Sequence, residues 1–503
     1  MARMQPAILS IDEGTTGTRA AWVTADGMVH GEEYRRLQVS TPRAGVVEQD
    51  AGEILAKTLE ACRIVIQRAA EAGYELKAAA IATQRATAVL WDTVSGHPLV
   101  PAMVWQDTRH AAGLEALGST WNDHLIQTVG RPAGVRSPYL WAAHHLRDSP
   151  AVAEAYAAKR LGFGTMETWL LWNLTRERAY LATSTNATSA GAYVLAEHRY
   201  EIPWIEALGF PVEILPELRQ DADELGHTDP QLLGLELPIR AAVGDQHAGT
   251  VGLGYLAAGQ AMCVHGTGSF VDLVTGPRLP ENPGLYDGTL TLTGWRRNHR
   301  SVYAVETFTA TTGSALDWLC GSLGWFESAV QISELAALAN GANGVMFVPA
   351  LTGIRVPVVE PRVRASLSGL SMATSRAEVA YAVLEGIAHS VASSVHANEE
   401  VAGVSVTEIR VGGGMSGSDP LIQMQADLTG IAMRRMPATG TASLRGAAFL
   451  AGADGLLWES LDTAARALGP GEWFEPAISA SEREERRSMW ARHINRELDQ
   501  VAH

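Results

Sequence analysis

The sequence predicts an α/β protein of two domains, and three observations carry this prediction. The chain has 503 residues, and a chain of that length normally forms two domains of about 250 residues each. Short β-prone runs alternate with alanine-rich segments of helical spacing. Two turns of glycine and threonine, each behind an apolar run, lie about half a chain apart, in 7–23 and 261–274. We therefore expect two related halves, divided near residue 253.

Hydrophobic periodicity places the main elements. Long helices are predicted where apolar residues recur at helical spacing, at 51–73 and 376–401. The charge-rich stretch 481–500 predicts a further helix, which we expect to be solvated at the surface. Strands are predicted at 78–84, 101–106, 239–245, 344–351 and 408–414.

The two glycine/hydroxyl turns predict hairpins whose backbone N–H groups and hydroxyls can hold a phosphate. A P-loop would need a lysine behind its glycines, but the three lysines, Lys57, Lys77 and Lys159, lie in no glycine-rich turn. Phosphate binding must then depend on backbone amides, hydroxyls, arginine and a metal ion. Taken singly, each turn is also compatible with an ordinary hairpin. The residues concerned are Asp12, Gly14, Thr15, Thr16 and Arg19 in the first turn, and Gly266, Thr267 and Gly268 in the second.

Composition further narrows the class of protein to which this chain can belong. The formal net charge of −16 disfavours a nucleic-acid partner. The cysteines Cys62, Cys263 and Cys320 lie far apart, which predicts buried thiols in a reducing cytoplasm and no disulfide frame or zinc site. No apolar stretch reaches membrane-spanning length, so we expect no membrane partner.

Carboxylates stand at the ends of two predicted strands. Asp12 ends the first strand, and Asp245, followed by Gln246, comes directly after the strand at 239–244. A carboxylate held on rigid structure can act on a bound substrate. The alternative is local, because aspartate also favours turns and helix N-caps.

Arg85 and Asp107 likewise follow apolar runs, with Trp105 between them in sequence. An aromatic face beside planar polar groups suits a polyol or sugar, whose C–H bonds pack on the ring while its hydroxyls form hydrogen bonds. The alternative is that Trp105 is a core residue and that Arg85 pairs with Asp107 or Asp92.

The order of these motifs resembles the FGGY family of carbohydrate kinases over nearly the whole chain, and most closely its glycerol kinases. The resemblance implies two actin-like, ribonuclease-H-like ATPase domains around a central cleft. Residues 1–253 would bind the acceptor, residues 254–503 would bind most of ATP and Mg²⁺, and the protein would be a homodimer. The matching motifs are DEGTTGTRA, VVEQD, TQRATAVLWDTVSGHPLVPAMVWQDTR, FGTMETWLLWNLT, GDQHAG, HGTGSF, VPALTGIRVP and RVGGGMSGSDPLIQMQAD.

Site residues follow from the same resemblance. It implies that Asp245 is the general base and that Asp12 helps to place Mg²⁺. The ATP-binding residues would be Thr15, Thr16, Arg19, Gly266, Thr267, Gly313, Leu316, Asp317, Gly414 and Ser418. The acceptor-binding residues would be Arg85, Ala86, Trp105, Val135, Asp245, Gln246 and Phe270.

Among the departures from the glycerol kinase pattern, three positions concern the proposed acceptor site and the first turn. Ala86 stands where these kinases carry glutamate, and an ungapped alignment puts Val135 where they carry tyrosine, with Tyr139 as an alternative source of the ring. Losing a hydrogen-bond partner for a buried hydroxyl costs about 1–3 kcal/mol, or roughly ten- to a hundredfold in glycerol affinity. We therefore expect a four- or five-carbon polyol or a ketose to bind at least as well as glycerol. Glu13 replaces glutamine beside the first turn, so it must point away or help to bind metal.

The sequence thus predicts ATP-dependent phosphoryl transfer to a hydroxyl of a small polyol or sugar. One alternative is a kinase of a longer polyol or ketopentose, such as erythritol, threitol, xylulose or ribulose. An alternative of another class is a non-catalytic ATP-switch protein with the same actin-like fold. Trp105, Arg85 and Gln246 favour the kinase, because a pure switch has no use for an acceptor pocket.

Overall fold

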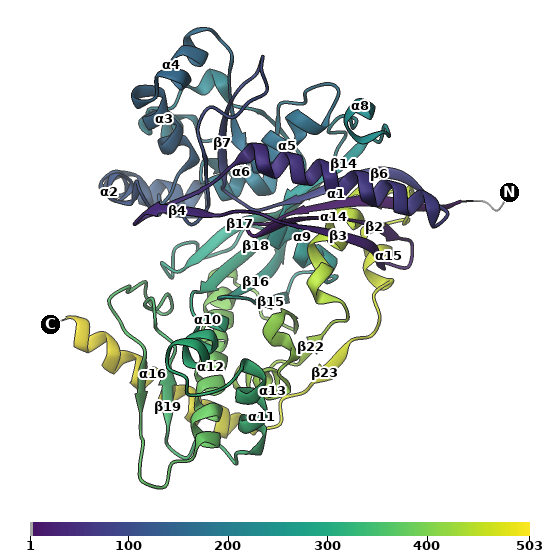
Figure 1. Ribbon diagram of the computed structural model, residues 1–503. Helices are drawn as coiled ribbons and strands as arrows, with labels where there is room; N and C mark the ends of the chain where they lie inside the picture. The colour runs from purple at the N-terminus through teal and green to yellow at the C-terminus, as the bar shows by residue number, and fades with distance from the viewer. Residues whose placement is uncertain (1–3, 503) are drawn as a thin grey trace. The chain divides into compact units, whose positions relative to one another are not determined.

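The computed structural model describes residues 4–502 (Figure 1). The chain forms two compact units, and neither is continuous in sequence. The first unit comprises 1–256, 292–303 and 441–468, and the second comprises 257–291, 304–440 and 469–503. The C-terminal part of the chain therefore contributes a segment to the first unit, which the hydrophobic pattern did not indicate.

The first unit contains a five-stranded mixed sheet in the order β14-β6-β1-β2-β3. β1 is antiparallel to β2 and parallel to β6, which is in turn parallel to β14. A second five-stranded sheet has the order β4-β5-β8-β7-β9. The strands are β1 (Gln5–Glu13), β2 (Gly17–Thr24), β3 (Val29–Arg36), β4 (Ser40–Arg43), β5 (Val46–Gln49), β6 (Tyr74–Thr83), β7 (Ala88–Asp92), β8 (Ala102–Met103), β9 (Leu161–Thr165), β10 (Leu181–Thr183), β11 (Tyr193–Val194), β12 (Arg199–Tyr200), β13 (Glu217–Arg219) and β14 (Ile239–Gly244).

Helices cover both faces of the first sheet, because successive side chains of β1 point to opposite faces of that sheet. Leu9 and Ile11 join the core cluster that includes buried residues of α1, whereas the Ser10 hydroxyl donates to the Leu444 carbonyl of α14 on the other face. The helices of this unit are α1 (Ala51–Glu71), α2 (Ala111–Thr128), α3 (Pro138–Asp148), α4 (Pro150–Ala157), α5 (Met166–Leu174), α6 (Ser184–Ala190), α7 (Ile202–Ala207), η1 (Val212–Ile214), α8 (Pro230–Leu233), α9 (Asp245–Gly252), α14 (Ala442–Gly452) and α15 (Leu461–Arg466).

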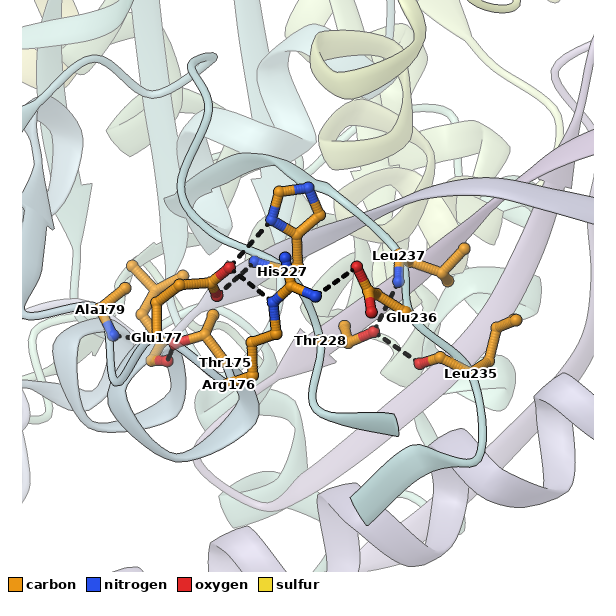
Figure 2. A network of polar contacts seen from close by, with 10 residues as sticks. Thr175, Arg176, Glu177, Ala179, His227, Thr228, Leu235, Glu236 and Leu237 are labelled. Carbon is orange, nitrogen blue, oxygen red and sulfur yellow. Dashed lines mark hydrogen bonds and ion pairs between the residues drawn. The ribbon is translucent and has the colours of Figure 1, made fainter. Parts of the chain in front are cut away.

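The segment that leads into β14 is tied to the end of α5 (Figure 2). The Glu177 carboxylate accepts the His227 backbone N–H at 2.9 Å, and Arg176 donates to both Glu177 and Glu236. The Thr228 hydroxyl accepts the buried N–H of Leu237 at 2.8 Å. Exposed ion pairs of this kind contribute little stability. The buried hydrogen bond from Leu237 to Thr228 is therefore the stronger anchor for the start of β14.

The second unit repeats the arrangement of strands seen in the first. Its sheet has the order β17-β18-β16-β15-β21-β22-β23, with β15 antiparallel to β16 and parallel to β21, which is parallel to β22. This shared topology confirms the prediction of two related halves. Residues 292–303 of β17 and β18 belong to the first unit. The strands are β15 (Gln260–His265), β16 (Ser269–Gly276), β17 (Thr289–Arg297), β18 (Arg300–Thr309), β19 (Met346–Val348), β20 (Ser366–Ser368), β21 (Glu408–Gly413), β22 (Met433–Arg435) and β23 (Glu472–Phe474).

The helices of the second unit include the longest in the chain. They are α10 (Gly313–Asp317), η2 (Trp318–Ser322), α11 (Ala329–Leu338), α12 (Arg376–Ala402), η3 (Gly414–Gly417), α13 (Asp419–Thr429) and α16 (Ala480–Ala502), with a short turn η4 (Thr439–Thr441) before α14. The predicted C-terminal helix exists, but it is not solvated on all sides. Trp490 and Ile494 are buried, and the Trp490 ring stacks on His389 of α12 at 4.9 Å. Among residues 4–502, no helix is long and apolar enough to span a membrane.

Candidate active site

The first glycine/hydroxyl turn joins β1 to β2, as predicted. The Gly14 N–H donates to the Gly17 carbonyl at 3.0 Å and closes the turn. Two side chains from other segments hold Thr15: Gln49 donates to its carbonyl at 2.8 Å, and the indole N–H of Trp105 donates to its hydroxyl at 2.8 Å. The turn is therefore joined directly to Trp105, the proposed acceptor-binding aromatic residue.

Asp12 and Glu13 end β1 on opposite faces of the sheet. Asp12 forms a hydrogen-bonded ion pair with Arg19 across the hairpin, and burial, which outweighs Arg19, raises the pKa of its carboxyl. Glu13 is fully buried and accepts from Thr58 of α1. Burial raises its pKa well above the usual range, which favours a neutral acid. Two alternatives were predicted for Glu13: it points away from the turn, or it helps to bind metal. Its position on the α1 face fits the first alternative.

The proposed base lies where two parallel strands end together. Gly244 of β14 pairs with Thr83 of β6, so the residues that follow these strands are neighbours. Arg85 Nε lies 3.7 Å from Asp245 Oδ1, and Arg85 Nη1 lies 3.5 Å from His247 Nε2. Burial and the neighbouring Arg85 lower the pKa of His247 well below its usual range, so its ring is neutral.

A buried polar network behind β14 fixes the residue before Asp245. The Thr185 hydroxyl, at the start of α6, accepts the Gly244 N–H at 2.9 Å and donates to Asp221 at 2.6 Å. The other oxygen of Asp221 accepts the Arg296 N–H at 2.7 Å. Burial raises the pKa of Asp221 to about 6, although its hydrogen bonds with Thr185 oppose this shift. The network orients the strand end that presents Asp245.

Removing this hydroxyl should affect both stability and turnover. We expect Thr185→Val to lower the free energy of unfolding by about 1–3 kcal/mol, because a buried N–H and a buried carboxylate each lose a partner. Turnover should fall as well, because the Gly244–Asp245 backbone is less firmly held. The Thr185→Ser variant keeps the hydroxyl and is the matched control. Urea unfolding and steady-state kinetics measure both effects, and a Val variant equal to the Ser variant would contradict the role of the network.

Trp105 is held at the turn by backbone as well as indole hydrogen bonds. The backbone N–H of Trp105 donates to the Thr87 hydroxyl at 3.3 Å. This bond places Trp105 beside the loop that contains Arg85. Asp107 accepts from the backbone of Val47 and pairs with Arg109, while Asp92 pairs with Arg160. Arg85 lies instead beside Asp245. The predicted strand at 101–106 is reduced to Ala102–Met103, because the chain turns at Trp105 with the Asp107 N–H bonded to the Val104 carbonyl.

The positions that depart from glycerol kinases differ in burial. Ala86 is 1% exposed and has a φ of 59°, a left-handed conformation that is uncommon for alanine. Val135 is 49% exposed. Gln246, a predicted acceptor-binding residue that matches the pattern, is partly buried at the start of α9. Tyr139 is buried on α3 against Phe163 and Phe210.

In the second unit, the second turn joins β15 to β16, as predicted, and several proposed ATP-binding residues meet it. The Gly313 N–H donates to the Gly266 carbonyl at 3.1 Å, and the Ser314 N–H donates to the Thr267 carbonyl at 3.0 Å. A side chain at Gly313 would bring its Cβ within 2.3 Å of the Gly266 carbonyl and 3.5 Å of the Met415 sulfur. Glycine is therefore required at this close approach, and the stretch beginning at Gly414 lies beside it.

The remaining predicted residues of this unit are more dispersed. Leu316 is buried in a core cluster, Asp317 is exposed, and the Ser418 hydroxyl lies 2.7 Å from the Ser333 hydroxyl. The partly buried Phe270 ring packs on Phe308 with 4.4 Å between centroids.

Sequence reasoning missed three residues of the first unit that lie beside predicted ones. Arg136 places its guanidinium carbon 5.7 Å from the Trp105 ring centroid, His247 lies against Arg85, and Thr185 supports Gly244. Only His247 had a local signal, since it stands two positions after Asp245 on the same helix. The other two meet their partners through long-range packing.

Solved structures establish the fold. The crystal structure of Plasmodium falciparum glycerol kinase with ADP has a TM-score of 0.90 at 25% identity, and the match covers 98% of each chain. A ligand-bound xylulose kinase from Lactobacillus acidophilus has a TM-score of 0.85 at 17% identity and covers 99% of each chain. The chain therefore has the two-domain α/β fold of the actin-like, ribonuclease-H-like ATPases.

Sequence comparisons define the family. Models of the N-terminal and C-terminal domains of the FGGY family of carbohydrate kinases match residues 7–252 and 261–454. Glycerol kinases of Alcanivorax borkumensis and Thermus brockianus are each 34% identical, covering 96% and 97% of this chain and 97% and 98% of their own lengths. The chain belongs to the FGGY family, and it is a carbohydrate or polyol kinase that uses ATP as the co-substrate.

Proposed function

We propose that this kinase phosphorylates a hydroxyl of a small polyol and that Asp245 is the general base. One observation carries the proposal: a single hydrogen bond, from the Trp105 indole to the Thr15 hydroxyl, links the aromatic acceptor residue to the phosphate turn. Asp245, at the end of β14, would take the proton of the attacking hydroxyl while Arg85 beside it stabilises the carboxylate. A protein catalyses phosphoryl transfer mainly by positioning the reactants and stabilising charge.

ATP is proposed to bind at both turns. Thr15, Thr16 and Arg19 of the first turn and Thr267 of the second would surround the phosphoryl groups, and the stretches at Gly313 and Gly414 would hold the adenosine. We assign acceptor binding mainly to residues 1–253 and nucleotide binding mainly to residues 254–503. The family resemblance further supports a homodimer, and the three free cysteines support a cytoplasmic location.

Asp12 fits a role in holding Mg²⁺. This ion keeps several waters and is bound through one or two carboxylates together with substrate phosphates. Asp12 presents one such carboxylate beside the hydroxyl-bearing turn, held in place by Arg19. When bound, Mg²⁺ would neutralise charge on the ATP phosphates. Among residues 4–502, no group of three or more His, Cys, Asp or Glu side chains is arranged as a metal site.

The acceptor itself is proposed to be glycerol or a longer polyol. The relatives named glycerol kinase support glycerol, whereas the alanine at buried position 86 supports a four- or five-carbon chain, because the smaller side chain leaves room and removes a hydrogen-bonding carboxylate. A ketopentose is the second candidate, supported by the same small residue.

Turnover with a panel of acceptors tests this proposal. ADP release would be measured with ATP and Mg²⁺ against glycerol, erythritol, threitol, the pentitols, xylulose and ribulose. We expect a four- or five-carbon polyol to match or exceed glycerol in kcat/KM. A clear preference for glycerol would overturn the expectation of a longer chain, and an exclusive preference for a ketose would favour the second candidate.

A further inference from the structure

A hollow lined by hydroxyl groups lies within the second unit. It is formed by the end of β18, the loop that follows β19, the middle of α12 and part of α16. The hollow holds about 450 Å³ of space, its open mouth included, which suits a small molecule. None of the residues that line it is among those proposed above to bind ATP or the acceptor. Any ligand of this hollow would therefore occupy a separate site.

The hydroxyl groups on the wall of the hollow can accept hydrogen bonds from a ligand. Ser390, Ser393 and Ser394 each donate to the main-chain carbonyl four residues earlier on α12, at 2.9–3.0 Å. Thr309, at the end of β18, donates to the Ser269 carbonyl at 3.3 Å. Because a carbonyl oxygen cannot donate, these hydroxyl protons are already used, and the oxygens keep lone pairs that can accept. A ligand that meets this wall must donate hydrogen bonds, as the O–H groups of a polyol do.

Two donors complete the lining. The exposed side chain of Arg355 lies over Phe308, with 5.6 Å from the guanidinium carbon to the ring centroid, and it forms no ion pair or hydrogen bond within residues 4–502. An arginine that stacks on an aromatic ring keeps its N–H donors at the edge. Trp490 is 6% exposed and stacks on His389, and its indole N–H forms no hydrogen bond within the same residues. Among the described residues that line the hollow, Arg355 is the only charged one.

A ligand that fits this lining carries both an acid group and hydroxyl groups. A neutral polyol would leave the Arg355 charge without a counter-ion, whereas a bare anion would bring its lone pairs against those of the serines. We propose that the hollow binds a small hydroxylated anion, with its carboxylate or phosphate group at Arg355 and its hydroxyl groups at the serines of α12. A guanidinium group matches either acid group through parallel N–H donors. The proposal goes beyond the proposed function, because no residue of the proposed catalytic site takes part in it.

Binding of four probes to the nucleotide-free protein tests this proposal. Isothermal titration calorimetry would compare glycerol 3-phosphate and glycerate, which carry both kinds of group, with glycerol, which lacks the acid, and inorganic phosphate, which lacks the carbon-bound hydroxyls. We expect Arg355→Gln to weaken the binding of at least one hydroxylated anion by at least about tenfold, the size of one charge-assisted hydrogen bond. Glycerol affinity should be unchanged. Ser393→Leu should abolish the same binding event, because the larger side chain would fill the hollow.

The matched control is Arg278→Gln, which removes the same charge from an exposed position of the second unit that does not line the hollow. It should leave the affinities of all four probes unchanged. Thermal unfolding would show that each variant is folded. If Ser393→Leu fails to fold, Arg355→Gln still decides the question, because the Arg355 side chain is exposed.

Each outcome is read from binding and is therefore independent of turnover and of the proposed function. Equal affinities of the wild type and Arg355→Gln for both hydroxylated anions would place their binding elsewhere and overturn the proposal. The proposal is also wrong if neither anion binds measurably to the wild type. If inorganic phosphate binds as tightly as the hydroxylated anions and is weakened equally by Arg355→Gln, the ligand is a bare anion and the role of the serines is rejected. A larger effect of Arg355→Gln on glycerol 3-phosphate than on glycerate would identify the acid group as a phosphate, and the reverse would identify a carboxylate.

Discussion

Asp245→Asn is expected to lower kcat by about 10²- to 10⁴-fold, the usual contribution of a general base. The amide has nearly the shape of the carboxylate but cannot take the proton of the attacking hydroxyl. Asp245 begins α9, where its carboxylate accepts the Gln246 N–H at 2.8 Å and lies beside Arg85. An asparagine oxygen can accept the same N–H, so the loss should appear in kcat more than in folding.

Asp148→Asn is a suitable control for this substitution, because it removes the same charge from an exposed position. Its kcat should equal that of the wild type. Both variants would be assayed by ADP release with the best acceptor, together with thermal unfolding. A kcat for Asp245→Asn within about fivefold of the wild type would rule out the general base role, since proton transfer contributes far more than that.

The sequence predicted those features of the fold that depend on local patterns. The two glycine/hydroxyl turns lie between antiparallel strands as expected, because alternating apolar runs on either side of such a turn specify a hairpin. The helices at 51–73 and 376–401 were likewise predicted from their spacing, and their bounds differ from the observed ones by at most two residues. The parallel pairing of β1 with β6 repeats in β15 and β21, which is why the half-chain spacing of the turns was informative.

Features set by long-range packing were not predictable in this way. The charge-rich pattern of 481–500 indicated a solvated helix, but Trp490 and Ile494 pack in a core cluster with residues of β19 and the following loop. Within the site, the approach of Arg136 to Trp105 and the bond from Thr185 to Gly244 join residues that are distant in sequence. No periodicity marks such pairs, because they depend on how separate elements pack together.

Two glycines allow residues 441–468 to pack in the first unit, and their role can be tested. α9 and α14 approach so closely that a Cβ on Gly446 would lie 1.7 Å from the Ala248 carbonyl oxygen, and one on Gly252 would lie 1.9 Å from the Ala442 carbonyl oxygen. Backbone atoms of both helices fill these spaces, so no side-chain rotation can relieve the overlap. Arg445 adds to the contact by donating to the Gly252 carbonyl at 2.7 Å, at the C-terminal end of α9.

We therefore expect Gly446→Ala to lower the free energy of unfolding by about 3 kcal/mol, the upper part of the usual range for overpacking, because the two helices must separate. Activity should fall too, since α9 begins with Asp245. Gly113→Ala is the matched control: Gly113 lies within α2, and its added Cβ would meet only Leu140, at an ordinary 3.8 Å. There the higher helix propensity of alanine should stabilise the protein by about 0.5–1 kcal/mol. Urea unfolding distinguishes the two substitutions by the sign of the shift in midpoint. If Gly446→Ala also raised the midpoint, the helices would not be in the close contact that holds the C-terminal segment on the first unit.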